Sequence, residues 1–92
     1  MPKLVVTAYY EKKLALFRKD HPELRAAYFK TISLLENNPK HPSLRLHKLK
    51  GALSEFHSVS IDLKYRIMID FLIDGDRIVL IDIGSHGGLY ML

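Results

Sequence analysis

The first part of the chain carries the hydrophobic pattern of one short strand followed by two helices. Residues 3–7 are short, β-branched and bounded by a hydroxyl residue, which is typical of a strand. Apolar residues then recur at helical spacing from residue 8 to about residue 19, and again from Pro22 to the Asn37-Asn38-Pro39 segment. Pro39 forbids continuation of the second helix. We therefore expect two antiparallel helices joined by a tight corner.

The second part of the chain changes to the two-residue period of strands. Three strand-like runs cover about residues 55–61, 65–73 and 77–83, and Asp74-Gly75-Asp76 predicts a hairpin between the last two. Residues 40–51 combine short alternations with a proline and a glycine, so they form either a loop or an irregular edge segment. The pattern predicts a single α+β domain over residues 1–92. Its order is β-α-α-β-β-β, with the helices packed on an antiparallel sheet in two layers.

One register of the last hairpin makes a whole face of the sheet apolar. Its pairs are Ile67 with Ile83, Ile69 with Ile81, and Phe71 with Val79. This face is expected to meet the helices, and the other face then carries Arg66 opposite Gly84 and beside His86. A register shifted by one residue is rejected because it sets isoleucines against Asp82 and Leu80.

Length and composition exclude several classes of protein. A chain of 92 residues forms one domain with one modest core. The absence of cysteine excludes a disulfide framework, a thiolate zinc site and a cysteine nucleophile. No apolar stretch approaches the roughly 20 residues that span a bilayer, and the opening residues do not read as a signal peptide. We therefore expect a cytoplasmic protein without a membrane partner.

The positive charge is concentrated in the central third of the chain. Between Lys40 and Arg66, six cations stand against two anions, whereas cations and anions cancel elsewhere. Such an excess predicts a basic patch suited to a polyanion such as nucleic acid. A solvated loop with scattered lysines is the open alternative.

Three segments of the chain, taken in order, carry a recognisable pattern. They are LHKLKG at residues 46–51, DLKYRIMI at residues 62–69 and IDIGSHGGLY at residues 81–90. Together with the element order, they resemble the RelE/ParE toxin superfamily of bacterial toxin–antitoxin systems over essentially the whole chain. The Gly-Ser-His-x-x-Leu-Tyr ending and the His-x-Leu-Lys-Gly segment are most similar to the YafQ branch, whose members are ribosome-dependent mRNA endonucleases.

The resemblance implies a toxin that cuts mRNA in the ribosomal A site, contacts 16S rRNA and is held inactive by a cognate antitoxin. Two other functions stay open: the ParE branch shares the fold but inhibits DNA gyrase, and a plain RNA-binding domain would use the same basic segment. No cofactor is expected. The five histidines lack compact ligand spacing, so no metal site is expected either. His21 and His41 each precede a proline and receive no role.

Metal-independent RNA cleavage needs a base for the 2′-hydroxyl proton, an acid for the departing 5′-oxygen, and cations for the phosphorane charge. Histidine suits both proton roles, and arginine can hold two phosphate oxygens at once. The resemblance implies His86 as the general acid, His57 as the base and Asp62 as the group that orients His57. Arg66 is expected to bind phosphate, because an arginine in a strand on the uncovered face needs an anionic partner. His47 matches the family's histidine before Leu-Lys-Gly and either shares the base role or binds phosphate.

A structural alternative stays open for most of these side chains. Strand alternation places His57 on the same side as apolar residues, so it is alternatively a partly buried histidine at the border of the core. Asp62 lies one residue farther from His57 than in the family pattern and is alternatively a turn residue bonding its own backbone. Arg66 alternatively forms an ion pair with Asp82, diagonally across the predicted register. His86 is alternatively a surface residue in a Gly-rich turn.

The remaining candidates are RNA-binding side chains. Lys48, Lys50 and Lys64 are expected to contact RNA, although lysines in exposed loops also serve solubility. Tyr90 either stacks on a base or packs the last residues onto the sheet. The catalytic candidates are expected to surround one concave patch on the sheet face away from the helices, with Lys48 and Lys50 at its rim.

Overall fold

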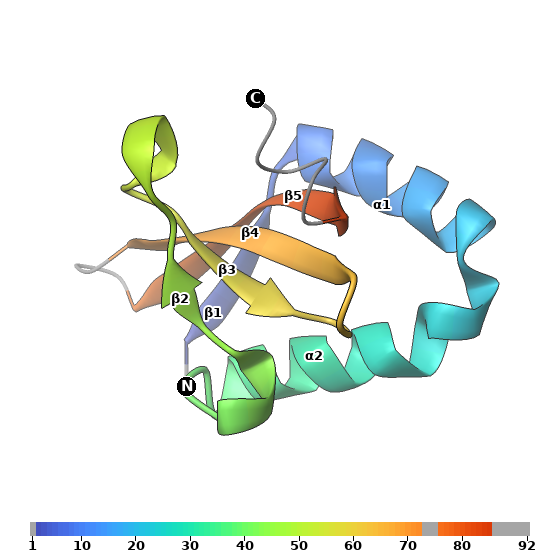
Figure 1. Ribbon diagram of the computed structural model, residues 1–92, viewed down its shortest axis with the longest axis horizontal. Helices are drawn as coiled ribbons and strands as arrows, with labels where there is room; N and C mark the ends of the chain where they lie inside the picture. Colours follow the sequence, from blue (N-terminus) through green and yellow to red (C-terminus); the bar gives the residue numbers. More distant parts are fainter. Residues whose placement is uncertain (1, 73–75, 86–92) are drawn as a thin grey trace.

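The computed structural model describes residues 2–72 and 76–85 and shows two helices packed on a five-stranded sheet (Figure 1). The elements, in chain order, are β1 (Lys3–Val6), α1 (Ala8–Asp20), η1 (Pro22–Leu24), α2 (Arg25–Asn37), η2 (Pro42–Leu44), β2 (His47–Lys48), η3 (Gly51–Leu53), β3 (His57–Ser60), β4 (Tyr65–Leu72) and β5 (Arg77–Ser85). The predicted α+β class and element order are confirmed. The segment left open between a loop and an edge contributes the two-residue strand β2.

The sheet is mixed, with the strand order β1-β5-β4-β3-β2. Strands β2 to β5 form the expected antiparallel meander, but β1 runs parallel to β5, from Lys3 beside Arg77 to Val6 beside Leu80. The expectation of a wholly antiparallel sheet is therefore wrong for β1. No tight turn fixes the direction of β1 relative to β5, because two helices and three strands separate them along the chain.

The β4–β5 pairing matches the predicted register only up to Met68. Ile67 faces Ile83 as expected, but beyond an irregularity at Met68/Ile69 the predicted partners of Ile69 and Phe71 are wrong. Ile69 pairs with Leu80, and Phe71 pairs with Ile78. A β-bulge places one extra residue in β5 and reverses its alternation from that point.

The bulge gives each face of β5 its own apolar cluster. Ile78, Leu80 and Ile83 join the main core between the sheet and the helices. Ile81 instead packs on a second cluster, built on Leu49 and Met68 with Leu53 and Phe56, at which η3 covers part of the other face. Apolar side chains of β5 are therefore buried on both faces of the sheet.

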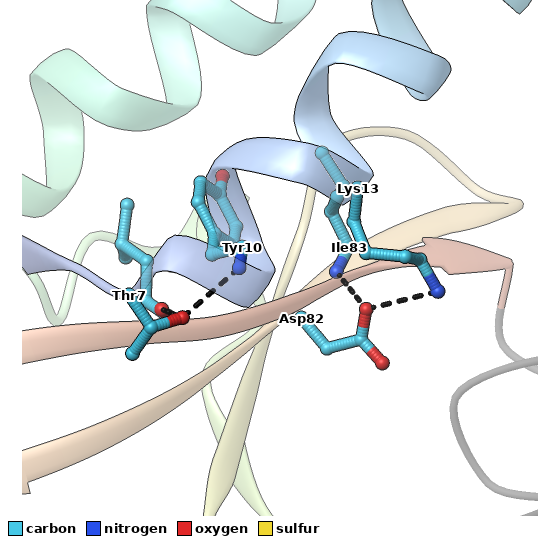
Figure 2. A network of polar contacts seen from close by, with 6 residues as sticks. Thr7, Tyr10, Lys13, Asp82 and Ile83 are labelled. Carbon is cyan, nitrogen blue, oxygen red and sulfur yellow. Dashed lines mark hydrogen bonds and ion pairs between the residues drawn. The ribbon is translucent and has the colours of Figure 1, made fainter.

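The helices are held to the sheet and to each other by buried contacts. The hydroxyl of Thr7 accepts a hydrogen bond from the Tyr10 amide at 3.0 Å and so caps α1 (Figure 2). The hydroxyls of Tyr10 and Tyr28 lie 2.9 Å apart in the core and join α1 to α2. Burial raises the pKa of both phenols. Of the described helices, none is long and apolar enough to cross a membrane.

Candidate functional site

His47 lies exposed at the β2 edge of the sheet, and contacts on both of its ring nitrogens orient the ring. Its Nδ1 is 3.1 Å from the carbonyl oxygen of Arg45, and its Nε2 is 3.4 Å from the hydroxyl of Ser58. A carbonyl can only accept a hydrogen bond, so the first contact requires the proton on Nδ1. The neutral ring then keeps its basic lone pair on Nε2.

Arg66, near the start of β4, has two guanidinium nitrogens without a hydrogen-bond partner in the described chain. It pairs with Ser60 on one side and with Gly84 on the other. Its Nε and Nη1 atoms are buried and have no hydrogen-bond partner within residues 2–72 and 76–85. Buried donors normally have partners, and a guanidinium matches the oxygens of phosphate or carboxylate. The site therefore has the donors for an anion that the described chain does not supply.

Asp82 is not the partner of Arg66. Its Oδ1 lies 3.1 Å from the Nζ of Lys13 on α1 and accepts a hydrogen bond from the Ile83 amide at 2.8 Å (Figure 2). The carboxylate is almost fully buried and already satisfied. The alternative of a structural ion pair between Arg66 and Asp82 is therefore wrong, because the carboxylate contacts Lys13 and the Ile83 amide instead.

A polar row on one sheet face connects His47 with Arg66. Ser58 is paired with His47, and Ser60 is paired with Arg66. Residues two apart in a strand share a face, so the two buried serines bridge the histidine and the arginine, while Val59 between them enters the main core. Strand spacing and rise put the Cα atoms of His47 and Arg66 about 12 Å apart.

Ser58 and Ser60 were not anticipated as parts of the site. The signal available in the sequence was their alternation with Val59, which is buried in the main core. Their hydroxyls give the row hydrogen-bonding groups where a strand would otherwise place apolar side chains. The Ser60 hydroxyl itself donates to the carbonyl of Asp62.

His57 lies on the opposite face of the sheet from His47 and Arg66. It shares its pleat with Val59, and its ring meets Phe71 edge-on at 5.1 Å between centroids. Burial lowers the pKa of His57, the charges of Lys48 and His47 lower it further, and Asp70 partly opposes them. The structure thus places His57 as a half-buried histidine at the core border and does not bring it into the expected common patch.

Asp62 is engaged by its own turn. Its Oδ1 accepts hydrogen bonds from the amides of Lys64 and Tyr65, each at 2.8 Å. The turn interpretation of Asp62 is therefore confirmed, and no contact joins it to His57 within the described residues. The carboxylate fixes the corner from which β4, and with it Arg66, begins.

The lysine candidates are exposed and lie at different places. Lys48 pairs with His57 in the β2–β3 register and so falls on the pleat opposite His47. Lys50 precedes η3, and the Nζ of Lys64 lies 5.4 Å from the centre of the Tyr65 ring.

His86 and Tyr90 lie outside the described residues, which stop at the end of β5. The two histidines without an assigned role make structural contacts: His21 packs on Phe17 and Tyr65, and His41 caps η2. In the part of the chain that the structure describes, no three His, Cys, Asp or Glu side chains form a group that could hold a metal ion.

Solved structures share this fold over most of the chain. YafQ from E. coli strain BL21(DE3) matches with a TM-score of 0.80 and 16% identity, covering 98% of this chain and 99% of YafQ. A YoeB/ParE toxin from Agrobacterium tumefaciens matches with a TM-score of 0.73 and 19% identity, covering 91% and 98%. This chain has the RelE/ParE toxin fold.

A further solved toxin structure has the same fold. A metal-bound toxin from Helicobacter pylori matches with a TM-score of 0.79 and 22% identity, covering 98% of this chain and 100% of that one. No protein-family model and no curated protein matches the chain. The resemblance predicted from three sequence segments is thus confirmed for the fold. Residue roles do not follow from a shared fold and depend on the side chains themselves.

Proposed function

We propose that this protein is the toxin of a toxin–antitoxin pair and that it cleaves mRNA on the ribosome without a metal ion. The observation that carries the proposal is the pair of buried, unpartnered Nε and Nη1 atoms of Arg66, on the same sheet face as the basic nitrogen of His47. The chain also has the fold of YafQ, and it is the resemblance of its sequence segments to the YafQ branch that implies this chemistry. A phosphodiester lying between these side chains would provide the anion that Arg66 lacks.

The proposed reaction is an internal transesterification. His47 Nε2 takes the proton of the 2′-hydroxyl, the 2′-oxygen forms a bond to phosphorus, and the bond from phosphorus to the 5′-oxygen breaks. His86, two residues after the Gly84 that pairs with Arg66, is proposed to protonate the departing oxygen. Arg66 stabilises the charge that builds up on the phosphorane oxygens. The products are a 2′,3′-cyclic phosphate and a 5′-hydroxyl end.

This assignment gives the base role to His47 in place of His57. The support is positional: the phosphate ligand Arg66 and the ring of His47 share a face, whereas His57 faces Phe71 and Val59. His57 is also a weaker base than a free histidine, because burial lowers its pKa. Asp62 then acts on the site only by holding the β3–β4 turn.

The proposed partners are the ribosome and an antitoxin, in the cytoplasm. Lys48, Lys50, Lys64 and Tyr90 are proposed to contact mRNA or 16S rRNA, because the first three are exposed cations within the basic segment. YafQ of E. coli, whose fold this chain shares, has been solved in a toxin–antitoxin complex with DinJ. A cognate antitoxin is proposed for this protein by analogy.

The proposal is tested by inducing the protein and its His86→Ala and Arg66→Met variants in bacteria. RNA ends and plasmid supercoiling are mapped in the same cultures. We expect new 5′-hydroxyl RNA ends within codons for the parent protein, no such ends for either variant, and unchanged supercoiling throughout. Altered supercoiling without RNA cleavage would replace the proposal with gyrase inhibition.

A further inference from the structure

A hollow outside the candidate site lies at the corner between the two helices. It has a volume of about 390 Å³ and is formed by the last turn of α1, by η1 and by the first turn of α2. Figure 1 shows this corner at the opposite end of the molecule from β2, which carries His47. The hollow is therefore separate from the polar row of His47 and Arg66.

The floor and wall of the corner hollow are apolar and aromatic. Phe17 and Tyr28 are mostly buried beneath it, and Leu24 is half-buried beside them. Phe29 stands at the wall with 49% of its surface exposed, and the guanidinium of Arg25 lies 5.6 Å from the centre of its ring. An exposed aromatic ring beside buried apolar side chains is a place where a partner's apolar side chain can be anchored.

The rim of the corner hollow is positive. Arg18, Lys19 and Arg25 line it, and no acidic residue does. Glu23 is nearby on η1, but its carboxylate lies 3.4 Å from the His21 ring. None of the three cations forms an ion pair with another residue of the described chain. The charge at the rim is thus available to an outside partner.

We propose that the corner hollow binds an acidic segment of a partner protein, with an apolar side chain seated on Phe17, Tyr28 and Phe29. Carboxylates of the segment face the three cations at the rim. A peptide fits better than RNA because the floor offers apolar surface and the phosphate-binding residues are elsewhere. The inference rests on the proposed function only in taking that partner to be the protein that neutralises this one.

The test measures binding of short synthetic peptides to the full-length protein by fluorescence anisotropy. The probes are a peptide of Glu, Leu and Phe, a peptide of Glu and Ser, a peptide of Lys, Leu and Phe, and a single-stranded oligouridylate. We expect the peptide of Glu, Leu and Phe to bind more tightly than the other three probes, because it alone combines carboxylates with apolar side chains. When this peptide is added in an NMR titration, the amide chemical shifts of the protein should change within residues 17–29.

Two variants and a matched control locate the interaction. Arg18→Glu combined with Arg25→Glu should lower the affinity for the peptide of Glu, Leu and Phe by more than about tenfold. Phe29→Ala, at an exposed position that costs the fold little, should weaken it by about threefold to tenfold. Lys12→Glu combined with Lys30→Glu makes the same change in net charge on the same helices, away from the hollow, and should leave binding within about twofold.

Three results would overturn the inference. The first is that the peptide does not bind, and the second is that the Arg18/Arg25 and Lys12/Lys30 double variants lose the same peptide affinity. The third is that oligouridylate binds and the Arg18/Arg25 variant abolishes that binding. The last result would assign the corner to nucleic acid. None of these measurements depends on RNA cleavage, so the inference and the proposed nuclease function can fail separately.

Discussion

Replacing Asp82 with alanine should destabilise the protein markedly, because its carboxylate contacts both the backbone of β5 and a lysine of α1. Asp82 is 4% exposed, accepts a hydrogen bond from the Ile83 amide at 2.8 Å, and lies 3.1 Å from the Nζ of Lys13. It sits where the bulge displaces β5 relative to β4. The substitution would leave a backbone donor unsatisfied and remove the ion pair that ties α1 to the sheet.

The expected loss follows from these two contacts. A hydrogen bond to a charged acceptor contributes about 1.5–3 kcal/mol. The ion pair adds about 0–1 kcal/mol, because the Lys13 side chain is 37% exposed and water screens it. Asp82→Ala should therefore lower the free energy of unfolding by about 2–3 kcal/mol, which corresponds to a fall in Tm on the order of 10–20 °C for a domain of this size.

Urea unfolding of a matched series separates the two contributions. Asp82→Asn keeps an oxygen for the Ile83 amide and should cost only about 1 kcal/mol, and Lys13→Met keeps the apolar stem and should cost about the same or less. Burial lowers the pKa of Lys13, but the hydrogen bond and charge of Asp82 raise it more, so the net shift is upward. The stability from Lys13 is thus complete below about pH 10.5 and lost above it. An Asp82→Ala protein within 0.5 kcal/mol of the parent would refute the reasoning.

Three further outcomes are expected. Asp62→Ala should lower stability by about 1–2 kcal/mol through the loss of two turn hydrogen bonds, whereas Asp62→Asn should retain most of it; equal effects in urea unfolding would contradict the turn role. Because the pKa of His57 is lowered in the folded protein, the unfolded chain binds a proton at this histidine at higher pH than the folded chain does. The stability of the fold should therefore fall as the pH drops below about 6.5. In measurements of Tm against pH, His57→Gln should remove this part of the dependence. Neutralising Lys48 together with Lys50 should flatten the salt dependence of ribosome binding, and a slope that stays unchanged would place the phosphate contacts elsewhere.

The sequence allowed the element order to be predicted because the local signals agreed with one another. Helical spacing, Pro39 and the Asp74-Gly75-Asp76 turn each mark an element or a boundary without reference to distant residues. The parallel pairing of β1 with β5 depends on segments at opposite ends of the chain. No local pattern determines it.

The bulge also could not be predicted from local pattern. A regular register pairs Ile69 with Ile81 and looks fully apolar, so alternation alone gives no cause to shift it. In the structure, β5 contributes apolar side chains to two clusters, one on each face of the sheet, and the hairpin sequence alone does not reveal the second cluster. Part of the second cluster, Leu49 and Leu53, comes from a segment to which the sequence assigned no definite strand or helix.

The candidate site could be predicted only where local strand alternation determines which face a side chain lies on. Arg66 on the face away from the main core follows from strand alternation, which is a local property. For His57, the same alternation pointed to the core side, and family resemblance pointed to catalysis. The structure agrees with the alternation.

The most direct test of the account is the single-turnover cleavage rate of mRNA on programmed ribosomes for His47→Gln and His57→Gln, with Tm measured for each protein. The account predicts that His47→Gln slows cleavage on the order of 10² to 10⁴-fold. His57→Gln should stay within about threefold of the parent, because its ring lies on the other face beside Phe71. A folded His47→Gln protein that cleaves at the parent rate, or a folded His57→Gln protein that does not cleave, would contradict the site proposed on the face shared by His47 and Arg66.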